Sequence, residues 1–184
     1  MKHFQIEKLV LSIFLLATSI ACQEDALLET QIEETDHDML AAVSMADEYL
    51  NSLRGKSENT ERSITVLRFY KDRLYFNTNT DTIRGYRELT ETSITAIVEP
   101  GEFIFWYSGG GVTDLDGIEF DPSSQNDLDE FPEEINEDKM WKIQVPQDGN
   151  LPMYKYDILY DHKGNSGSPI RLDPKIRIQG NGDA

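Results

Sequence analysis

Short runs of alternating apolar and polar residues fill the chain from residue 63 onward. Clusters of Gly, Pro, Asn and Asp separate these runs, and no helical period appears between them. Alternation with a period of two, carried by β-branched and aromatic residues, is typical of β-strands. The pattern therefore predicts a mainly β domain over residues 63–180, built as an antiparallel sandwich. The runs expected to form strands include 63–70, 73–77, 94–98, 103–107, 140–145, 154–160 and 175–178.

The chain is organised around the stretch Ile94–Asp121. Pro100 and Gly101 suit the two central positions of a type II turn, since proline fixes φ and glycine accepts a positive φ. Residues 103–107 are bulky and apolar on both faces, which indicates a central strand of a packed sandwich. We expect the glycines 109–111 to end that strand, and an acidic turn and a third short strand to follow.

This stretch resembles the paired strands of cupredoxin-like β-sandwiches. The residues that carry the resemblance are Val98, Pro100, Gly101, Glu102, Ile104 and Trp106. Two later segments look like the closing strands of copper-free relatives, among them bacterial inclusion-body proteins: Lys155-Tyr156-Asp157-Ile158 and Asp173-Pro174-Lys175-Ile176. The resemblance covers roughly the C-terminal half. It implies a Greek-key sandwich of the cupredoxin or immunoglobulin kind, and no particular activity.

One amphipathic α-helix is expected before the strands, at residues 35–54. Thr35 is suited to cap it, and an apolar stripe recurs at spacings of three and four. The stripe consists of Met39, Val43, Ala46, Leu50 and Leu53. A helix of this length is marginal alone, so we expect its stripe to pack on the sandwich. Self-association through the same stripe is the alternative. A polar linker, 55–62, follows, and a short tail, 181–184, ends the sequence.

The first 21 residues have the basic start and apolar core of a secretory signal peptide. Cys22, the sole cysteine, follows directly and resembles the lipidated cysteine of a bacterial lipoprotein, although Ser19 stands where that motif usually has leucine. Ordinary cleavage after Ala21 is the alternative. Residues 22–34 would then form an acidic tether from Cys22. We expect an exported protein anchored to the cell outer membrane by lipid. It would lie on either the periplasmic or the surface face of that membrane.

The charge balance narrows the range of partners. Without Lys2, Glu7 and Lys8 the chain keeps 15 of its 17 basic and 33 of its 34 acidic residues, a net charge of −18. Such a surface repels nucleic acid and anionic lipid head groups, so neither is an expected partner. We expect a monomer that meets the membrane only through the lipid on Cys22, with an unidentified protein or polysaccharide as partner.

Histidine and cysteine are too scarce for several kinds of site. A blue-copper centre needs two histidines and a cysteine. The expected sandwich has no cysteine, and the three histidines are His3, His37 and His162. Copper electron transfer, zinc sites built from Cys or His, and Cys-His catalysis are therefore excluded. No cofactor is expected apart from a candidate Ca²⁺.

The candidate calcium ligands surround Gly117. They are Asp114, Asp116, Glu119 and Asp121. Carboxylates at alternate positions around a glycine turn could converge on one Ca²⁺, which prefers six to eight oxygen ligands. The spacing differs from that of an EF-hand loop. A solvated acidic turn is the alternative, because the chain is acidic throughout.

The segment Pro122–Asp138 is acidic and poor in apolar residues, which predicts a long mobile loop. Leu128 and Phe131 are its candidate binding residues, because loops on rigid sandwiches often carry recognition. Together these features favour a non-catalytic cell-envelope lipoprotein, an accessory or binding module. The alternative is a surface hydrolase that works with paired carboxylates, with or without calcium, since such pairs are abundant in this chain.

Overall fold

The computed structural model of the chain describes residues 37–53, 61–80, 85–137, 139–148 and 152–178. The predicted signal peptide, Cys22, the tether, most of the linker and the tail lie outside the described residues. The chain divides into two units, Met1–His37 and Asp38–Ala184. All but one of the described residues belong to the second unit.

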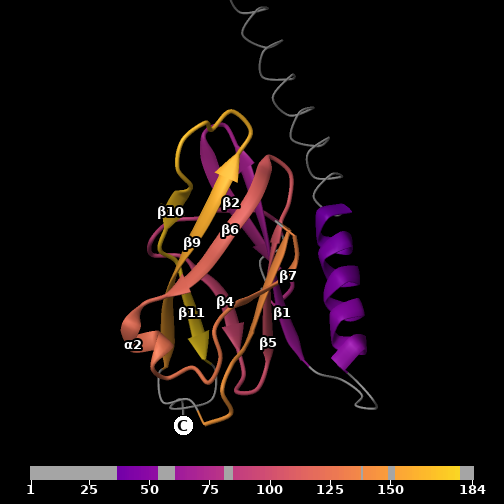
Figure 1. The fold of residues 1–184 in the computed structure, drawn as a ribbon, viewed down its shortest axis with the longest axis vertical. Coiled ribbons are helices and arrows are strands. Elements are labelled where there is room, and N and C mark those ends of the chain that lie inside the picture. Colours follow the sequence, from indigo (N-terminus) through magenta and orange to yellow (C-terminus); the bar gives the residue numbers. More distant parts are fainter. Residues whose placement is uncertain (1–36, 54–60, 81–84, 138, 149–151, 179–184) are drawn as a thin grey trace, which may run out of the picture. The chain divides into compact units, whose positions relative to one another are not determined.

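The expected mainly β sandwich, preceded by one helix, is confirmed. The strands are β1 (Arg62–Tyr70), β2 (Arg73–Thr78), β3 (Arg87–Glu88), β4 (Ile94–Val98), β5 (Phe103–Ser108), β6 (Val112–Phe120), β7 (Glu133–Asn136), β8 (Met140–Gln144), β9 (Met153–His162), β10 (Ile170–Leu172) and β11 (Lys175–Ile178). One sheet has the order β3-β2-β1-β5-β8-β7. The other runs β10-β9-β11-β4, and β6 also pairs with β9 (Figure 1).

The expectation of a purely antiparallel sandwich is wrong at two strand pairs. β1 and β5 are parallel, with Thr65 opposite Trp106. β11 and β4 are also parallel, with Ile178 opposite Val98. Parallel pairing requires a long connection, and both pairs join segments far apart along the chain. Both sheets are therefore mixed. The sequence could not show this, because alternation within a strand does not identify the distant strand with which it pairs.

The Pro100-Gly101 turn forms as expected but does not make a hairpin. Glu102 N–H donates to the Glu99 carbonyl at 3.2 Å, and Gly101 has φ of 85°. These are the hydrogen bond and the positive φ of a type II turn. The strands on either side, β4 and β5, belong to different sheets. The turn therefore carries the chain across the sandwich.

The main core lies between the sheets and contains one buried polar network. Trp106 is fully buried and its Nε1 donates to the Tyr156 hydroxyl at 3.2 Å. Thr95 Oγ1 forms a second hydrogen bond with the same hydroxyl. Burying a phenol is costly unless it is hydrogen-bonded, and here the hydroxyl has two hydrogen-bond partners. This network joins β4, β5 and β9 across the core.

The described helix, residues 37–53, packs on the outer face of the six-stranded sheet. Its buried residues are Ala42, Ala46 and Leu50, which meet apolar side chains of β1, β5 and β8. Tyr49 contacts Phe103 and Phe105 edge to face. The predicted stripe is wrong at one position, because Leu53 is 56% exposed. The contact face turns instead through Ala42 and Tyr49, which the prediction did not include.

The glycines 109–111 do more than end a strand. The chain here runs so close to β1 that a side chain would collide with it. A Cβ atom at Gly111 would lie 2.2 Å from the Phe69 carbonyl oxygen, and Gly111 has φ of 82°. A Cβ at Gly109 would lie 2.9 Å from the Leu67 carbonyl oxygen. Asp38 Oδ2 accepts from Gly110 N–H at 2.8 Å, which ties the helix to this turn.

Candidate functional site

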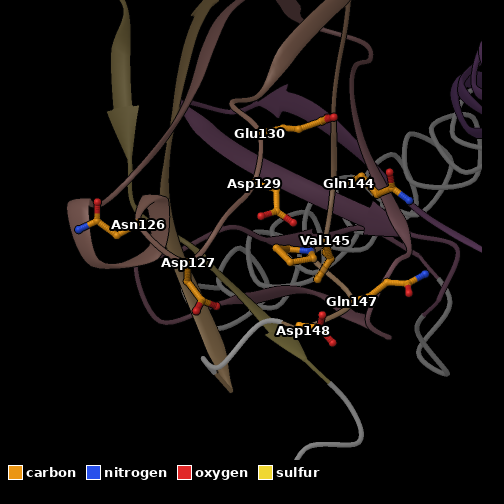
Figure 2. A pocket seen from close by; sticks show the side chains of 9 residues that line it. Asn126, Asp127, Asp129, Glu130, Gln144, Val145, Gln147 and Asp148 are labelled. Carbon is orange, nitrogen blue, oxygen red and sulfur yellow. The ribbon is translucent and has the colours of Figure 1, made fainter.

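A pocket of about 540 Å³ opens between the segment that follows α2 (Pro122–Gln125) and the segment that ends β8. Its lining consists of Asn126, Asp127, Asp129, Glu130, Gln144, Val145, Pro146, Gln147 and Asp148. Figure 2 shows these side chains, from two separate stretches of sequence, around one opening. Carboxylates and amides make up most of the wall.

The first wall is fixed by a short helix whose start the sequence encodes. Asp121 caps α2 by accepting from Ser124 N–H at 2.8 Å, and Pro122 occupies the first helical turn. Burial tends to raise the pKa of Asp121, but hydrogen bonds from Ser124 and Ser123 outweigh this and lower it. Leu128 then packs against the main core. These contacts hold residues 126–130 beside the pocket.

Asp127 is fixed from the core side by a tyrosine. The Tyr154 hydroxyl donates to Asp127 Oδ2 at 2.8 Å, and Tyr154 itself is buried in β9. Burial raises the pKa of Tyr154, and the neighbouring Asp127 carboxylate raises it further. The phenol therefore stays a donor over the whole ordinary pH range. One lining carboxylate of the pocket is thereby held in place.

Lys142 of β8 pairs with the pocket residue Glu130 and is buried, with only 5% of its surface exposed. Its Nζ is 2.8 Å from Glu133 Oε2 and 3.6 Å from Glu130 Oε2. It also lies 5.6 Å from the centre of the Tyr49 ring. Burial lowers the pKa of Lys142, but the bonds to Glu133 and Tyr49 outweigh it, and the net pKa is raised. Lys142 thus links β7, the pocket segment and the helix.

The second wall rests on the Pro100-Gly101 turn. Gln144 Nε2 donates to the Gly101 carbonyl at 2.9 Å, and Val145 N–H donates to the Glu102 carbonyl at 2.9 Å. Glu102 is buried, and this burial raises the pKa of its carboxyl group. Glu99 N–H donates to Glu102 Oε2 at 2.7 Å. The turn that crosses the sandwich is therefore also the support of Gln144 and Val145.

The charge of the pocket wall has one sign. Four carboxylates line it, those of Asp127, Asp129, Glu130 and Asp148, and no Lys, Arg or His is among the lining residues. Neighbouring carboxylates in a concave surface favour a positively charged occupant, because the walls concentrate the field. Gln144 and Gln147 add amide groups that can donate and accept. The site is suited to a cation that also forms hydrogen bonds.

The four candidate calcium ligands are not on a turn. Asp114, Asp116 and Glu119 lie along β6, and Asp121 follows it as the α2 cap. Glu119 forms an ion pair with Arg171, which also bonds Asp157 at 2.6 Å. Within the described ranges, no group of three or more Asp, Glu, His or Cys residues could hold a metal ion. The expected convergence of carboxylates is therefore not observed. The sequence predicts a turn here because Gly117 and the carboxylates interrupt the alternation of a strand. In the structure, β6 continues through this stretch with two register shifts, one on each side of Asp114.

The two candidate binding residues have different environments. Leu128 is partly buried against the core, so it anchors the segment. Phe131 is 74% exposed, just beyond the pocket residue Glu130. The prediction of a long mobile loop over Pro122–Asp138 is wrong, because α2 and β7 form within it. The sequence carried one signal that this prediction missed, an Asp-Pro pair suited to a helix start.

Sequence reasoning also missed the second wall of the pocket. Gln144 lies at the end of an ordinary alternating strand and Asp148 in the polar stretch after it, so neither residue stands out in the sequence. Lys142 gave a signal: it takes a strand position on the same face as the buried Met140. A lysine at such a position predicts a buried, paired charge. The pairing partners, Glu130 and Glu133, could not be read from spacing.

Comparison with known proteins finds no family model that matches the chain and no curated protein that matches it significantly. In the part of the chain that the structure describes, no helix has both the length and the apolar character needed to cross a membrane.

Proposed function

We propose that the protein is a non-catalytic cell-envelope lipoprotein, a binding module whose acidic pocket takes a cationic ligand. The observation that carries the proposal is the pocket of about 540 Å³, lined by four carboxylates and by no basic residue. Phe131, 74% exposed beside it, adds an aromatic surface that suits a cation. The sandwich supplies a rigid scaffold, as in many binding modules whose contacts come from connecting segments.

The second candidate is a hydrolase that uses paired carboxylates. The grouping of Asp127, Asp129, Glu130 and Asp148 in one pocket is the observation that favours it. Such an enzyme needs one carboxyl as acid and a second as base or nucleophile. Release of product from a panel of chromogenic glycosides would favour the hydrolase. Loss of that release in Asp129→Asn would place the chemistry in the pocket.

Spermidine, a small polycation, is expected to bind the purified chain, and removal of two pocket charges should weaken binding about tenfold. The double variant Asp129→Asn/Asp148→Asn removes two lining carboxylates with little change in shape. Isothermal titration calorimetry at low ionic strength would measure the dissociation constant.

The matched control is Glu48→Gln/Glu91→Gln, which changes the net charge equally at two exposed positions outside the pocket. This control should bind spermidine nearly as well as the unchanged chain. Equal weakening in both double variants would mean that net charge alone attracts the polycation, and the pocket would lose its assigned role.

The exported chain is expected to carry a lipid on Cys22 that anchors it to the membrane. Cells grown with labelled palmitate should incorporate label into the unchanged protein and not into Cys22→Ala. The variant should also leave the membrane fraction, because no other lipid attachment is expected. Label that persists in Cys22→Ala would remove the lipoprotein part of the proposal, and the pocket would then be judged by spermidine binding alone.

A further inference from the structure

We propose that the outer edge of β7 docks an extended basic peptide segment, which adds to the six-stranded sheet as a further strand. The inference rests on the proposed function and specifies its ligand: a polypeptide with alternating basic side chains. The partner would pair with the backbone of β7 and place basic side chains against the acidic surface that continues into the pocket.

The edge itself is the first observation. β7 (Glu133–Asn136) is the last strand of the order β3-β2-β1-β5-β8-β7, and no described strand pairs with it on its outer side. On its inner side it pairs antiparallel with β8, with Glu134 opposite Trp141. The outward N–H and C=O groups of an edge strand form a ready template for another strand. Strand addition to such an edge is a recurring mode of peptide recognition.

Charge selects the occupant. The segment 126–137 contains six acidic residues and no basic one. Glu133 and Glu134 on β7 are both exposed, although Glu133 also bonds the buried Lys142. A second copy of this chain would bring the same acidic edge, and like charges on paired strands are destabilising. The acidic edge attracts a basic strand and repels a second copy of itself, so it favours a cationic partner over self-pairing.

Two features extend the docking surface beyond the backbone of β7. Phe131 precedes the strand and exposes its ring, which suits both apolar packing and contact with a cation. Glu130, the last pocket residue of this segment, lies three residues before β7, so the pocket adjoins the start of that strand. Glu134 lies on the strand itself and is exposed. The partner's basic side chains would therefore meet carboxylates both on the strand and in the pocket, two of which, Glu130 and Glu133, also pair with Lys142.

The test uses the purified full chain and a fluorescent peptide of alternating Lys and Val residues. Its partner probe is the same peptide with N-methyl groups on alternate backbone nitrogens, which keeps the charge and removes strand pairing. Fluorescence anisotropy should show binding of the plain peptide, and about tenfold weaker binding of the methylated one. Glu134→Lys should weaken the plain peptide similarly, while Glu91→Lys, with the same charge change away from the edge, should matter little.

The outcomes separate this inference from the proposed function. If spermidine binds the pocket but both peptides bind equally or not at all, the strand-addition inference fails and the function stands. If neither spermidine nor peptide binds, both fail. If the plain peptide binds better than the methylated one and Glu134→Lys removes that preference, the edge is the docking site.

Discussion

Substituting Gly111 by alanine is expected to lower the free energy of unfolding by about 4 kcal/mol, near the upper limit for single substitutions. Two effects add. A φ of 82° is a left-handed conformation that costs an alanine roughly 1–2 kcal/mol. The added Cβ would also lie 2.2 Å from the Phe69 carbonyl oxygen, which is backbone in the six-stranded sheet and cannot move aside. Urea unfolding followed by circular dichroism would measure the loss.

Gly164→Ala is the matched control. Gly164 has φ of 102°, also left-handed, but nothing lies within 4 Å of a Cβ placed there. Its alanine variant should lose only the conformational part, roughly 1–2 kcal/mol. If the two variants lose equal stability, the close approach to β1 has no energetic weight.

Raising the pH from 7 to 11 is expected to remove about 3 kcal/mol of stability through two buried tyrosines. Burial raises the pKa of both Tyr154 and Tyr156, and each is only 1% exposed. In the unfolded chain these phenols lose their protons near pH 10, whereas in the folded chain they keep them. Unfolding therefore releases protons above pH 10. The stability that the two protonated tyrosines contribute is fully present below about pH 10. It falls as the pH rises further, by roughly 1.4 kcal/mol per tyrosine at pH 11.

The measurement is urea unfolding at several pH values, with phenolate absorbance recorded alongside. Tyr156→Phe should be about 2 kcal/mol less stable at neutral pH, because Trp106 and Thr95 lose their shared partner. Above pH 10, however, its stability should fall less steeply, since one titrating group is gone. A slope unchanged by Tyr156→Phe would show that its phenol is not protected in the folded protein. Lys142, whose pKa is also raised, acts in the same direction.

Alternation of residues predicted most strands but not their partners. The sequence predicts the runs at β1, β2, β4, β5, β8, β9 and β11, because apolar, β-branched or aromatic residues recur there at alternate or successive positions. The parallel β1–β5 and β4–β11 pairs were not, since pairing depends on contacts between distant segments. β6 was missed as a long strand because its bulges and carboxylates break the alternation.

Of the candidate site, the sequence indicated one half. The sequence singles out the acidic segment after Asp121 together with Phe131, which is exposed and directly follows the pocket residue Glu130. The other half, Gln144 to Asp148, comes to the pocket only because β8 pairs with β7 and rests on the Pro-Gly turn. A concave surface made by two distant segments has no local signature, so spacing alone could not reveal it.

The parallel pairing of β4 with β11 also bears on how the chain folds. Ile94 lies opposite Lys175, so β4 gains its strand partner only after most of the sandwich sequence has been made. Contacts between segments so distant in sequence slow folding, because a long loop must close before they form. A nascent chain that ends before residue 175 would therefore carry an apolar strand, β4, without its hydrogen-bonded partner strand. Such truncated chains should aggregate, whereas chains that reach residue 178 can complete both sheets.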